Sequence, residues 1–434
     1  MNPLYRNDSP GEFPDSWYVA STDIPPQRPP LKGEVQADVC VIGAGYTGLS
    51  AARHLASKGL EVVVLDAHRA GFGASGRNGG QVCSGYDYPQ TTLTKKLGAG
   101  PAKALWQLAE EAKADLRDLC TNTIPEARYT PGVLHGTYTA KETAEDQAEV
   151  DLLAREYGYD QARVCGPEEM TTLIKSPHYH GGLLDMGAGH IHPLRYVLGL
   201  ARLAEEAGAR IYERSEVHRI DKGDPAIVAT NKGRVKARFV ILAGNGYLPN
   251  LERKVAARVM PLNSFIGATE PLGVRAEEIM GQDIAVHDSK WVANYFRLSE
   301  DKRLLFGGRP SYSLGFPDGI ATLMHKRILN IFPQLEGVKL DYAWGGTLGV
   351  TIPRMPAIIR VAPNILSAGG YSGHGVALSG LAGKVMAEAV AGQASRFDTF
   401  ADLNVPSYPG GPAFRAPLLR LAMTWYSLRD RLGL

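Results

Sequence analysis

The chain has 434 residues, of which 44% are hydrophobic and 21% charged, and its formal net charge at pH 7 is +2. This composition is typical of a soluble globular protein with two or three domains. Because 47 Lys and Arg residues are nearly balanced by 45 Asp and Glu residues, we expect no basic surface for a nucleic acid.

The cysteines and the N-terminus suggest a reducing compartment. Cys40, Cys83, Cys120 and Cys165 form neither a CxxC pair nor a zinc-ligand spacing, so we expect reduced thiols and no bound metal. Residues 1–33 carry acidic residues and many prolines, which a secretory signal lacks. No uncharged run approaches the roughly 20 apolar residues of a membrane-spanning helix. We therefore expect a cytoplasmic protein that is not embedded in a membrane.

The first regular elements form a βαβ unit after a proline-rich leader. The pattern predicts a strand at 38–42, a helix at 49–57 and a second strand at 61–65. Glycines close the first strand and end the helix. This order is typical of a parallel sheet.

The middle of the chain mixes helices with strand-like stretches. Helical spacing of apolar residues predicts helices at about 102–119, 142–157, 194–207 and 323–332. Strand-like segments at 210–212 and 239–243 continue the parallel pattern, whereas 263–308 alternates like antiparallel strands. Near the end, a strand at 365–368, a glycine turn at 369–375 and a helix at 376–391 repeat the order of the first unit.

The segment Gly43-Ala44-Gly45-Tyr46-Thr47-Gly48 matches the GxGxxG dinucleotide fingerprint in its proper context, between a strand and a helix. The glycines permit a tight turn, a close approach to a pyrophosphate and close helix packing, and the helix N-terminus attracts the phosphates. Asp66 follows about 20 residues later, where a carboxylate accepts hydrogen bonds from ribose hydroxyls. The alternative is a glycine turn that binds nothing.

A glycine-rich loop, residues 71–81, comes directly after the second strand. Such a loop can lie flat against a bulky ring system, because missing Cβ atoms permit close approach. Arg77, Asn78 and Gln81 would supply polar groups. The alternatives are a flexible surface loop and, for Arg77, a structural ion pair.

The C-terminal glycine turn places a second helix N-terminus at a strand end, which stabilises negative charge. His374, in this turn, would face a substrate or merely cap the helix. His190 and His192 lie beside Pro193, where a buried structural role is favoured over catalysis.

These segments together resemble the D-amino-acid-oxidase-like FAD family, and the resemblance covers nearly the whole chain. The specific motifs are 73–81, with SGRNGGQ, and 370–376, with GYSGHGV; the others are 43–48, 189–194 and 243–245. The resemblance implies that residues 75–81 line the ribityl chain and isoalloxazine, that Val217 meets adenine through its backbone, and that 370–376 cover the flavin pyrimidine.

The resemblance implies oxidation of a primary or secondary amine, with transfer of hydride to FAD and reoxidation by dioxygen. The expected substrate is gamma-glutamylputrescine, which would give an aldehyde, ammonia and hydrogen peroxide. Alternatives are a dehydrogenase with another electron acceptor, an oxidase of sarcosine or D-amino-acid type, and a non-catalytic dinucleotide-binding module.

Two departures from sarcosine-oxidase relatives refine this expectation. Those enzymes hold the substrate carboxylate with basic residues, including a lysine just after the GHG element, where this chain has Ala377. A simple α-amino acid is therefore disfavoured. They also attach flavin to a cysteine in the C-terminal half, whereas this chain has no cysteine beyond Cys165. Non-covalent FAD is expected.

The predicted fold is α/β, with a Rossmann-type FAD-binding domain assembled from discontinuous segments and an α+β substrate domain with a mostly antiparallel sheet. The predicted segments are a leader at 1–36, the FAD-binding domain at 37–90, 190–260 and 340–395, the substrate domain at 91–189 and 261–339, and a tail at 396–434. The tail carries an amphipathic helix pattern, docked on the protein or a subunit or, alternatively, attached to a membrane. Whether the protein is a monomer or a homo-oligomer stays open.

The candidate site residues fall into two groups. The catalytic candidates are His374, Trp344, Gln81 and Tyr371, with core packing as the alternative for Trp344. The expected FAD-binding residues are Gly43, Ala44, Gly45, Tyr46, Thr47, Gly48, Asp66, Ala67, Gly73, Ala74, Ser75, Arg77, Asn78, Gly79, Gly80, Gln81, Val217, Ala243, Gly244, Gly370, Tyr371, Ser372, Gly373, His374, Gly375 and Val376.

Overall fold

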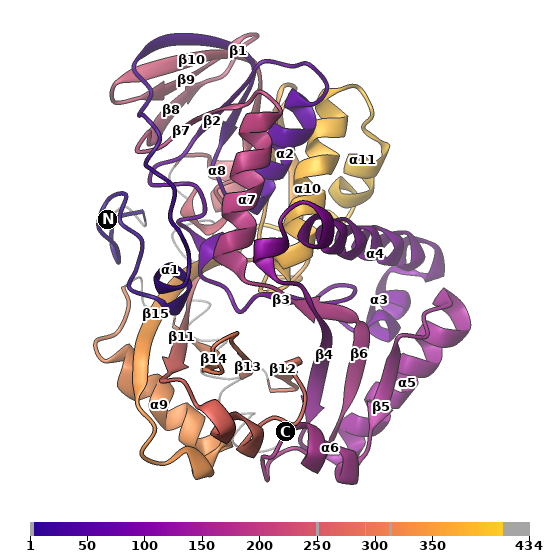
Figure 1. Cartoon of the computed structure of the whole chain (residues 1–434). Coiled ribbons are helices and arrows are strands. Elements are labelled where there is room, and N and C mark those ends of the chain that lie inside the picture. The colour runs from indigo at the N-terminus through magenta and orange to yellow at the C-terminus, as the bar shows by residue number, and fades with distance from the viewer. Residues whose placement is uncertain (1–3, 249–250, 291, 312–314, 411–434) are drawn as a thin grey trace.

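The structure, a computed structural model, describes residues 4–248, 251–290, 292–311 and 315–410. The helix expected in the tail at about 415–431 lies outside these ranges. The described strands form two sheets, one above the other in Figure 1, with helices packed along them.

The first sheet is largely parallel and carries the predicted βαβ unit. Its central order is β16-β17-β10-β1-β2-β7; β16 runs antiparallel to β17, and the β8–β9 hairpin joins through β9 to β10. The parallel pairs are β1 with β10, β1 with β2, β2 with β7, and β10 with β17. The strands are β1 (Gly33–Ile42), β2 (Val62–Leu65), β7 (Arg210–Tyr212), β8 (Val217–Asp221), β9 (Ala226–Thr230), β10 (Gly233–Leu242), β16 (Ala357–Ala362) and β17 (Ile365–Gly369).

Both faces of this sheet are buried, because side chains alternate between two cores along each strand. Val39 and Val41 of β1 face the core that contains the helices, whereas Cys40 and Ile42 face the opposite core. This explains why β1 and β2 read as continuous apolar runs in the sequence.

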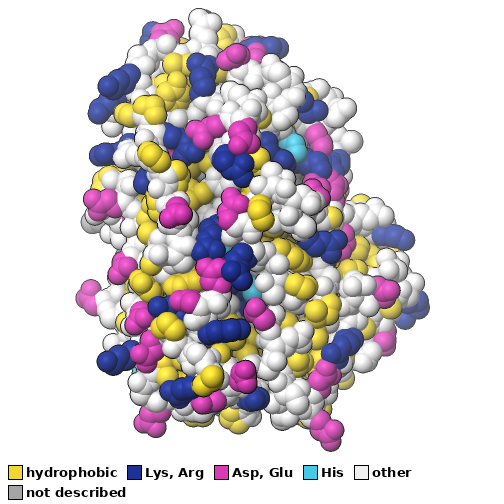
Figure 2. Space-filling view, viewed as in Figure 1, with side chains coloured by type: hydrophobic (Ala, Val, Ile, Leu, Met, Phe, Trp, Pro, Cys, Tyr) yellow, Lys and Arg dark blue, Asp and Glu magenta, His cyan; other side chains and the backbone are white. Residues whose placement is uncertain are grey.

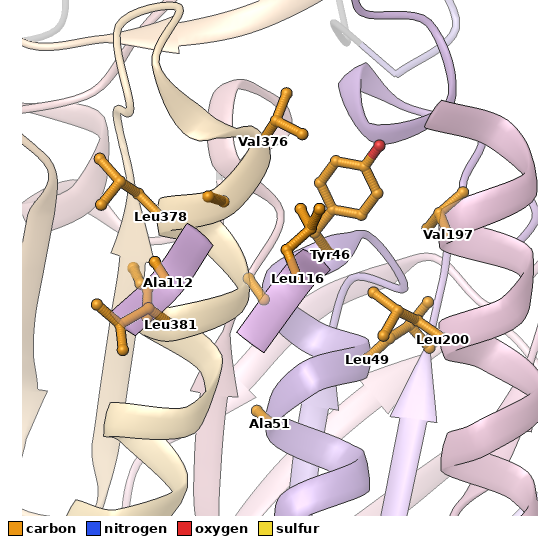
Figure 3. Close-up of a cluster of buried hydrophobic side chains, with 14 of the residues drawn as sticks. Tyr46, Leu49, Ala51, Ala112, Leu116, Val197, Leu200, Val376, Leu378 and Leu381 are labelled. Carbon is orange, nitrogen blue, oxygen red and sulfur yellow. The ribbon is translucent and has the colours of Figure 1, made fainter. Parts of the chain in front are cut away.

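The helical core brings together segments that are far apart in the chain. In Figure 3, α2 lies between α7 and α10, and Leu49, Leu200 and Leu381 belong to this buried cluster. The helices of this layer are α2 (Tyr46–Ala56), α4 (Ala99–Asn122), α7 (Pro193–Glu206) and α10 (Gly375–Val390).

The second sheet is mostly antiparallel, with the order β15-β11-β14-β13-β12-β4-β6-β3 and with β5 paired to β6; β12 and β4 are parallel. Its strands are β3 (Gln81–Val82), β4 (Thr130–Thr137), β5 (Ala162–Cys165), β6 (Gly181–His190), β11 (Met260–Thr269), β12 (Ala285–Asp288), β13 (Tyr295–Leu298), β14 (Leu304–Ser311) and β15 (Leu340–Val350). The remaining α-helices are α1 (Trp17–Ala20), α3 (Gln90–Leu97), α5 (Ala140–Tyr157), α6 (Pro167–Leu173), α8 (Arg253–Ala256), α9 (Ile320–Ile331) and α11 (Ser395–Ala401).

The predicted fold class is confirmed, since a parallel αβ layer and a mostly antiparallel sheet are both present. The domain boundaries stay a prediction, but sheet membership differs from them at two places. β15 lies within the predicted FAD-binding segment 340–395, yet it pairs antiparallel with β11 along nearly its whole length. β3, within segment 37–90, pairs with β6 of the same second sheet.

The surface carries charges of both signs. On the face shown in Figure 2, Lys and Arg side chains are interspersed with Asp and Glu side chains. Within the described part of the chain, no helix is both long and apolar enough to cross a membrane.

The contact between α10 and α2 predicts a sharp difference between two glycines of α10. A Cβ atom at Gly383 would lie 2.3 Å from the backbone oxygen of Thr47, whereas a Cβ atom at Gly380 would meet no atom within 4 Å. We expect Gly383→Ala to force the helices apart and to lower the free energy of unfolding by about 1–3 kcal/mol. Chemical denaturation measures this.

Gly380→Ala is the matched control in the same helix. It should leave stability unchanged or raise it by up to about 1 kcal/mol, because alanine favours a helix over glycine. Equal destabilisation by both substitutions would contradict the assigned helix contact.

Candidate functional site

A cavity of about 1170 Å³ opens between the two sheets, at the carboxyl ends of β1 and β2. It is larger than the roughly 300–1,000 Å³ of most small-molecule sites. Its lining runs from the turn after β1, along the glycine-rich loop, to strands β4 and β12 and helix α5 of the second sheet. One continuous space therefore has room for a dinucleotide and a second, smaller molecule.

The turn after β1 is shaped by glycines that approach other backbone segments. Gly43 has a φ of +107°, and a Cβ atom there would lie 2.8 Å from the carbonyl oxygen of Ala243. A Cβ atom at Gly48 would lie 1.8 Å from the oxygen of Gly43. The first and third glycines of the motif thus have the turn and packing roles that the sequence predicted. Gly48 itself does not line the cavity.

Asp66 ends β2 and holds this turn with its carboxylate. Its two oxygens accept hydrogen bonds from the backbone N–H groups of Ala44 and His68, each 2.8 Å long. Burial raises the pKa of Asp66 to about 6, although these two donors act in the opposite direction. Asp66 also lines the cavity, and its carboxylate has lone pairs left for further hydrogen bonds.

Arg77 stabilises the glycine-rich loop through contacts with other parts of the protein. Its side chain is 2% exposed and forms an ion pair with Asp8 of the leader at 2.8 Å. Nε donates a hydrogen bond to the carbonyl oxygen of Phe72 at 2.7 Å, and Nη1 donates one to the carbonyl oxygen of Gly345 at 3.2 Å. The structural ion pair considered from the sequence is therefore present. Arg77 borders the cavity, but its paired nitrogens face protein.

Asn78 and Gln81 also organise the loop through their side chains. Asn78 donates from Nδ2 to the carbonyl of Ala74 at 2.9 Å and accepts from the N–H of Gly80 at 2.8 Å. Gln81 donates from Nε2 to the carbonyl of Val286 in β12 at 2.7 Å. The loop is thus ordered, which is incompatible with the flexible surface loop considered as an alternative.

The C-terminal glycine turn closes another side of the cavity. Tyr371 and Thr47 share a hydrogen bond of 2.7 Å between their hydroxyls, which joins this turn to α2. His374 lies 3.2 Å from the carbonyl oxygen of Ser84, so Nε2 carries the proton that it donates. Burial lowers the pKa of His374 to about 4, and the ring is neutral at pH 7. His374 precedes α10 but makes no side-chain cap, so it faces the cavity rather than capping the helix.

Trp344 does not reach the cavity, which corrects its candidate catalytic role. It is 2% exposed, its indole N–H donates to the backbone oxygen of Arg77 at 3.1 Å, and its ring packs 5.2 Å from that of Tyr18. β15 presents Trp344 to the core beneath the glycine-rich loop. The core-packing alternative is the observed one.

Most of the predicted site residues lie together in the lining of the cavity. Gly370 does not line the cavity; its N–H donates to the side-chain oxygen of Asn245. His190 and His192 are buried outside the lining, as the structural interpretation had it. The predicted residues that line the cavity are Gly43, Ala44, Gly45, Tyr46, Thr47, Asp66, Ala67, Gly73, Ala74, Ser75, Arg77, Asn78, Gly79, Gly80, Gln81, Val217, Ala243, Gly244, Tyr371, Ser372, Gly373, His374, Gly375 and Val376.

The sequence analysis missed the residues that line the far end of the cavity. His135 and His287 project from β4 and β12, and Asp146 from α5 lies beside His135. Asp185 of β6 accepts hydrogen bonds from Ser84 and Tyr159. No motif links these residues, because the pairing of β4 with β12 and with β6 and the packing of α5 bring them together.

Known proteins resemble the chain over nearly its whole length. The family model described as "FAD dependent oxidoreductase" (DAO) matches residues 38–389. Gamma-glutamylputrescine oxidoreductase of Escherichia coli is 40% identical and covers 97% of this chain and 99% of its own. The probable oxidoreductase OrdL of Rhizobium meliloti is 41% identical, with 96% and 97% covered.

Solved structures share the fold at much lower identity. Glycine oxidase from Geobacillus kaustophilus aligns with a TM-score of 0.70 at 19% identity, covering 83% of this chain and 95% of its own. L-proline dehydrogenase from P. horikoshii aligns with a TM-score of 0.68, also at 19% identity, covering 85% and 96%.

The ion pair between Arg77 and Asp8 generates a stability prediction. Asp8→Ala leaves a guanidinium buried without its counter-charge, which we expect to cost about 3–5 kcal/mol of the free energy of unfolding. Denaturant titration measures the loss. As a control, Glu34→Ala removes the partner of exposed Arg234 and should cost at most about 1 kcal/mol. Similar losses in both variants would contradict a special role for the buried pair.

The lowered pKa of His374 generates a pH prediction. Between pH 6.5 and about 4 an unfolded histidine binds a proton that the folded one does not, so this residue makes stability fall as the pH falls. We expect His374→Gln to remove about 1–3 kcal/mol of that acid-induced loss. Unfolding of the ligand-free protein at pH 7 and pH 4.5 measures it. Exposed His178→Gln is the control; an unchanged pH profile in both variants would refute the prediction.

Proposed function

The chain belongs to the family of FAD-dependent oxidoreductases, and on this premise we propose that it oxidises gamma-glutamylputrescine at its primary amine. The products would be the corresponding aldehyde, ammonia and hydrogen peroxide. FAD is its cofactor and an amine its class of substrate, as in its relatives, so the alternative of a non-catalytic module is wrong. The relative's name supports the particular amine.

The predicted FAD-binding residues that line the cavity fit this cofactor, and we propose that they hold it. The turn from Gly43 to Thr47 would receive the pyrophosphate, Asp66 the ribose, and Val217 the adenine. The ordered loop from Gly73 to Gln81 would support the flavin ring. When bound, FAD supplies the acceptor for the substrate's hydride.

We further propose that FAD is held without a covalent bond. Cys83 lines the cavity, a position that the sequence argument about C-terminal cysteines did not consider. Burial raises the pKa of its thiol to about 12, so Cys83 is protonated at pH 7 and a weak nucleophile.

The observation that carries the amine proposal is the charge at the far end of the cavity. Four carboxylates line it, those of Asp185 on β6 and of Glu142, Asp146 and Glu149 on α5. The lining also holds two lysines, Lys95 and Lys290, which the four carboxylates outnumber. Negative charge on low-dielectric walls raises the local concentration of a cation. Ala377, where sarcosine-oxidase relatives place a carboxylate-binding lysine, also lines the cavity. The site therefore favours a cationic amine over a simple α-amino acid.

The neutral ring of His374 bears on the proton that the amine must lose. A primary ammonium with a pKa of about 10.4 needs roughly 4–5 kcal/mol to become neutral at pH 7, and only the neutral form releases hydride. Burial keeps His374 neutral, so the ring does not repel the incoming cation. Enclosure between the sheets lowers the amine's own pKa by desolvation.

The experiment that tests this function follows the flavin. We expect purified protein to be yellow and its visible flavin band to bleach when gamma-glutamylputrescine is added without oxygen. Admission of air should restore the band and release one hydrogen peroxide per amine oxidised. Sarcosine and a D-amino acid are the controls and should bleach it far more slowly.

Each other outcome has its own consequence. Bleaching only by another amine would reject the proposed substrate. Reoxidation without peroxide would reject the oxidase and favour a dehydrogenase with another electron acceptor. A cytoplasmic location stays a prediction, and the choice between a monomer and a homo-oligomer stays open.

A further inference from the structure

Two histidines stand side by side at the far end of the cavity. In the parallel pairing of β4 with β12, His135 lies directly opposite His287. Side chains opposite one another on paired strands share one face of the sheet. Both rings line the cavity, and their centroids are 5.3 Å apart with a tilt of 36°.

This pair is fixed from two directions. Asp146 of α5 lies 3.0 Å from Nδ1 of His135, which therefore donates to the carboxylate. β12 is joined to the glycine-rich loop by the hydrogen bond from Gln81 to the carbonyl of Val286, the residue before His287. The position of His287 is thereby set relative to the loop that would support the flavin.

His287 differs from the other histidines of the cavity lining in its hydrogen bonds. His68 contacts the backbone of Leu4 and Gly11, His135 is bound to Asp146, and His374 to Ser84. The side chain of His287 makes no hydrogen bond to any residue that the structure describes. Its Nδ1 is enclosed by protein without a partner, so Nε2 is the ring nitrogen left for a molecule in the cavity. The large majority of buried side-chain polar atoms have a partner. An unused imidazole on the wall of a ligand cavity indicates a ligand.

The charge around His287 fits an amine. Burial, together with His135 from β4 and His374 from the turn before α10, lowers its pKa to about 3. The ring is therefore neutral and offers a lone pair. Behind it, the carboxylates of Asp146, Glu142 and Asp288 raise the pKa of His135 although its burial lowers it, so this end of the cavity favours positive charge.

We propose that His287 binds the substrate through Nε2, which accepts a hydrogen bond from an N–H of its amine. In this assignment, His135 and Asp146 are positioning residues that hold the ring of His287 against the cavity. The inference rests on the proposed function, because it takes an amine as the ligand. It adds the residue that recognises that amine, which no motif in the sequence marks.

The test separates binding from chemistry. Anaerobic stopped-flow reduction of the FAD-loaded protein by gamma-glutamylputrescine gives an amine dissociation constant and a limiting rate of flavin bleaching. We expect His287→Ala to raise the dissociation constant about tenfold or more, with FAD content and the unfolding midpoint unchanged. His287→Asn, which keeps a neutral acceptor, should recover part of the loss.

Further variants distinguish recognition from structure. His135→Asn and Asp146→Asn should raise the dissociation constant less than His287→Ala does, and exposed His178→Asn should leave it unchanged. An amine dissociation constant within twofold of the parent in both His287 variants would overturn the proposal.

A failure of the proposed function has a different signature. If gamma-glutamylputrescine does not bleach the flavin of the parent protein, its binding is measured by calorimetry in the parent and in both His287 variants. Weaker binding in His287→Ala supports the proposal even then. Equal binding, or no binding to the parent, overturns it.

Discussion

The site depends on one buried guanidinium, because Arg77 joins three parts of the chain that are distant in sequence. It binds the leader through Asp8, the glycine-rich loop through the carbonyl of Phe72, and β15 of the second sheet through the carbonyl of Gly345. A buried charge is costly unless it is paired and hydrogen-bonded. The backbone around Arg77 therefore takes positions that place these partners within reach. The loop that would carry the flavin is ordered for this reason, although it is rich in glycine.

Local sequence predicted the dinucleotide half of the cavity well. The strands at 38–42 and 61–65 and the helix after the GxGxxG turn are present, because that turn, its glycines and Asp66 interact within about 25 residues of one another. Helix α10 after the second glycine turn is also present, although that turn is joined to Thr47 and Asn245, which are distant in sequence. Where the backbone itself makes the site, residue type and spacing carry most of the information.

The roles of individual side chains were harder to predict. Arg77 and Asn78 lie at the cavity as expected, yet their hydrogen bonds go largely to protein, and Trp344 packs under the loop instead of facing a substrate. A sequence shows that such residues are near a site. Only the fold shows on which side of the backbone each one points.

The far end of the cavity is built in a different way from the glycine turns. His135 and His287 meet only because β4 pairs with β12, and Asp146 reaches them from α5. Such contacts between distant positions leave no local pattern, and each of them can change without disturbing the glycine turns. Glycine oxidase and L-proline dehydrogenase share this fold at 19% identity. The fold therefore does not depend on most side chains, so the side chains at the far end of the cavity are free to differ between proteins that share it.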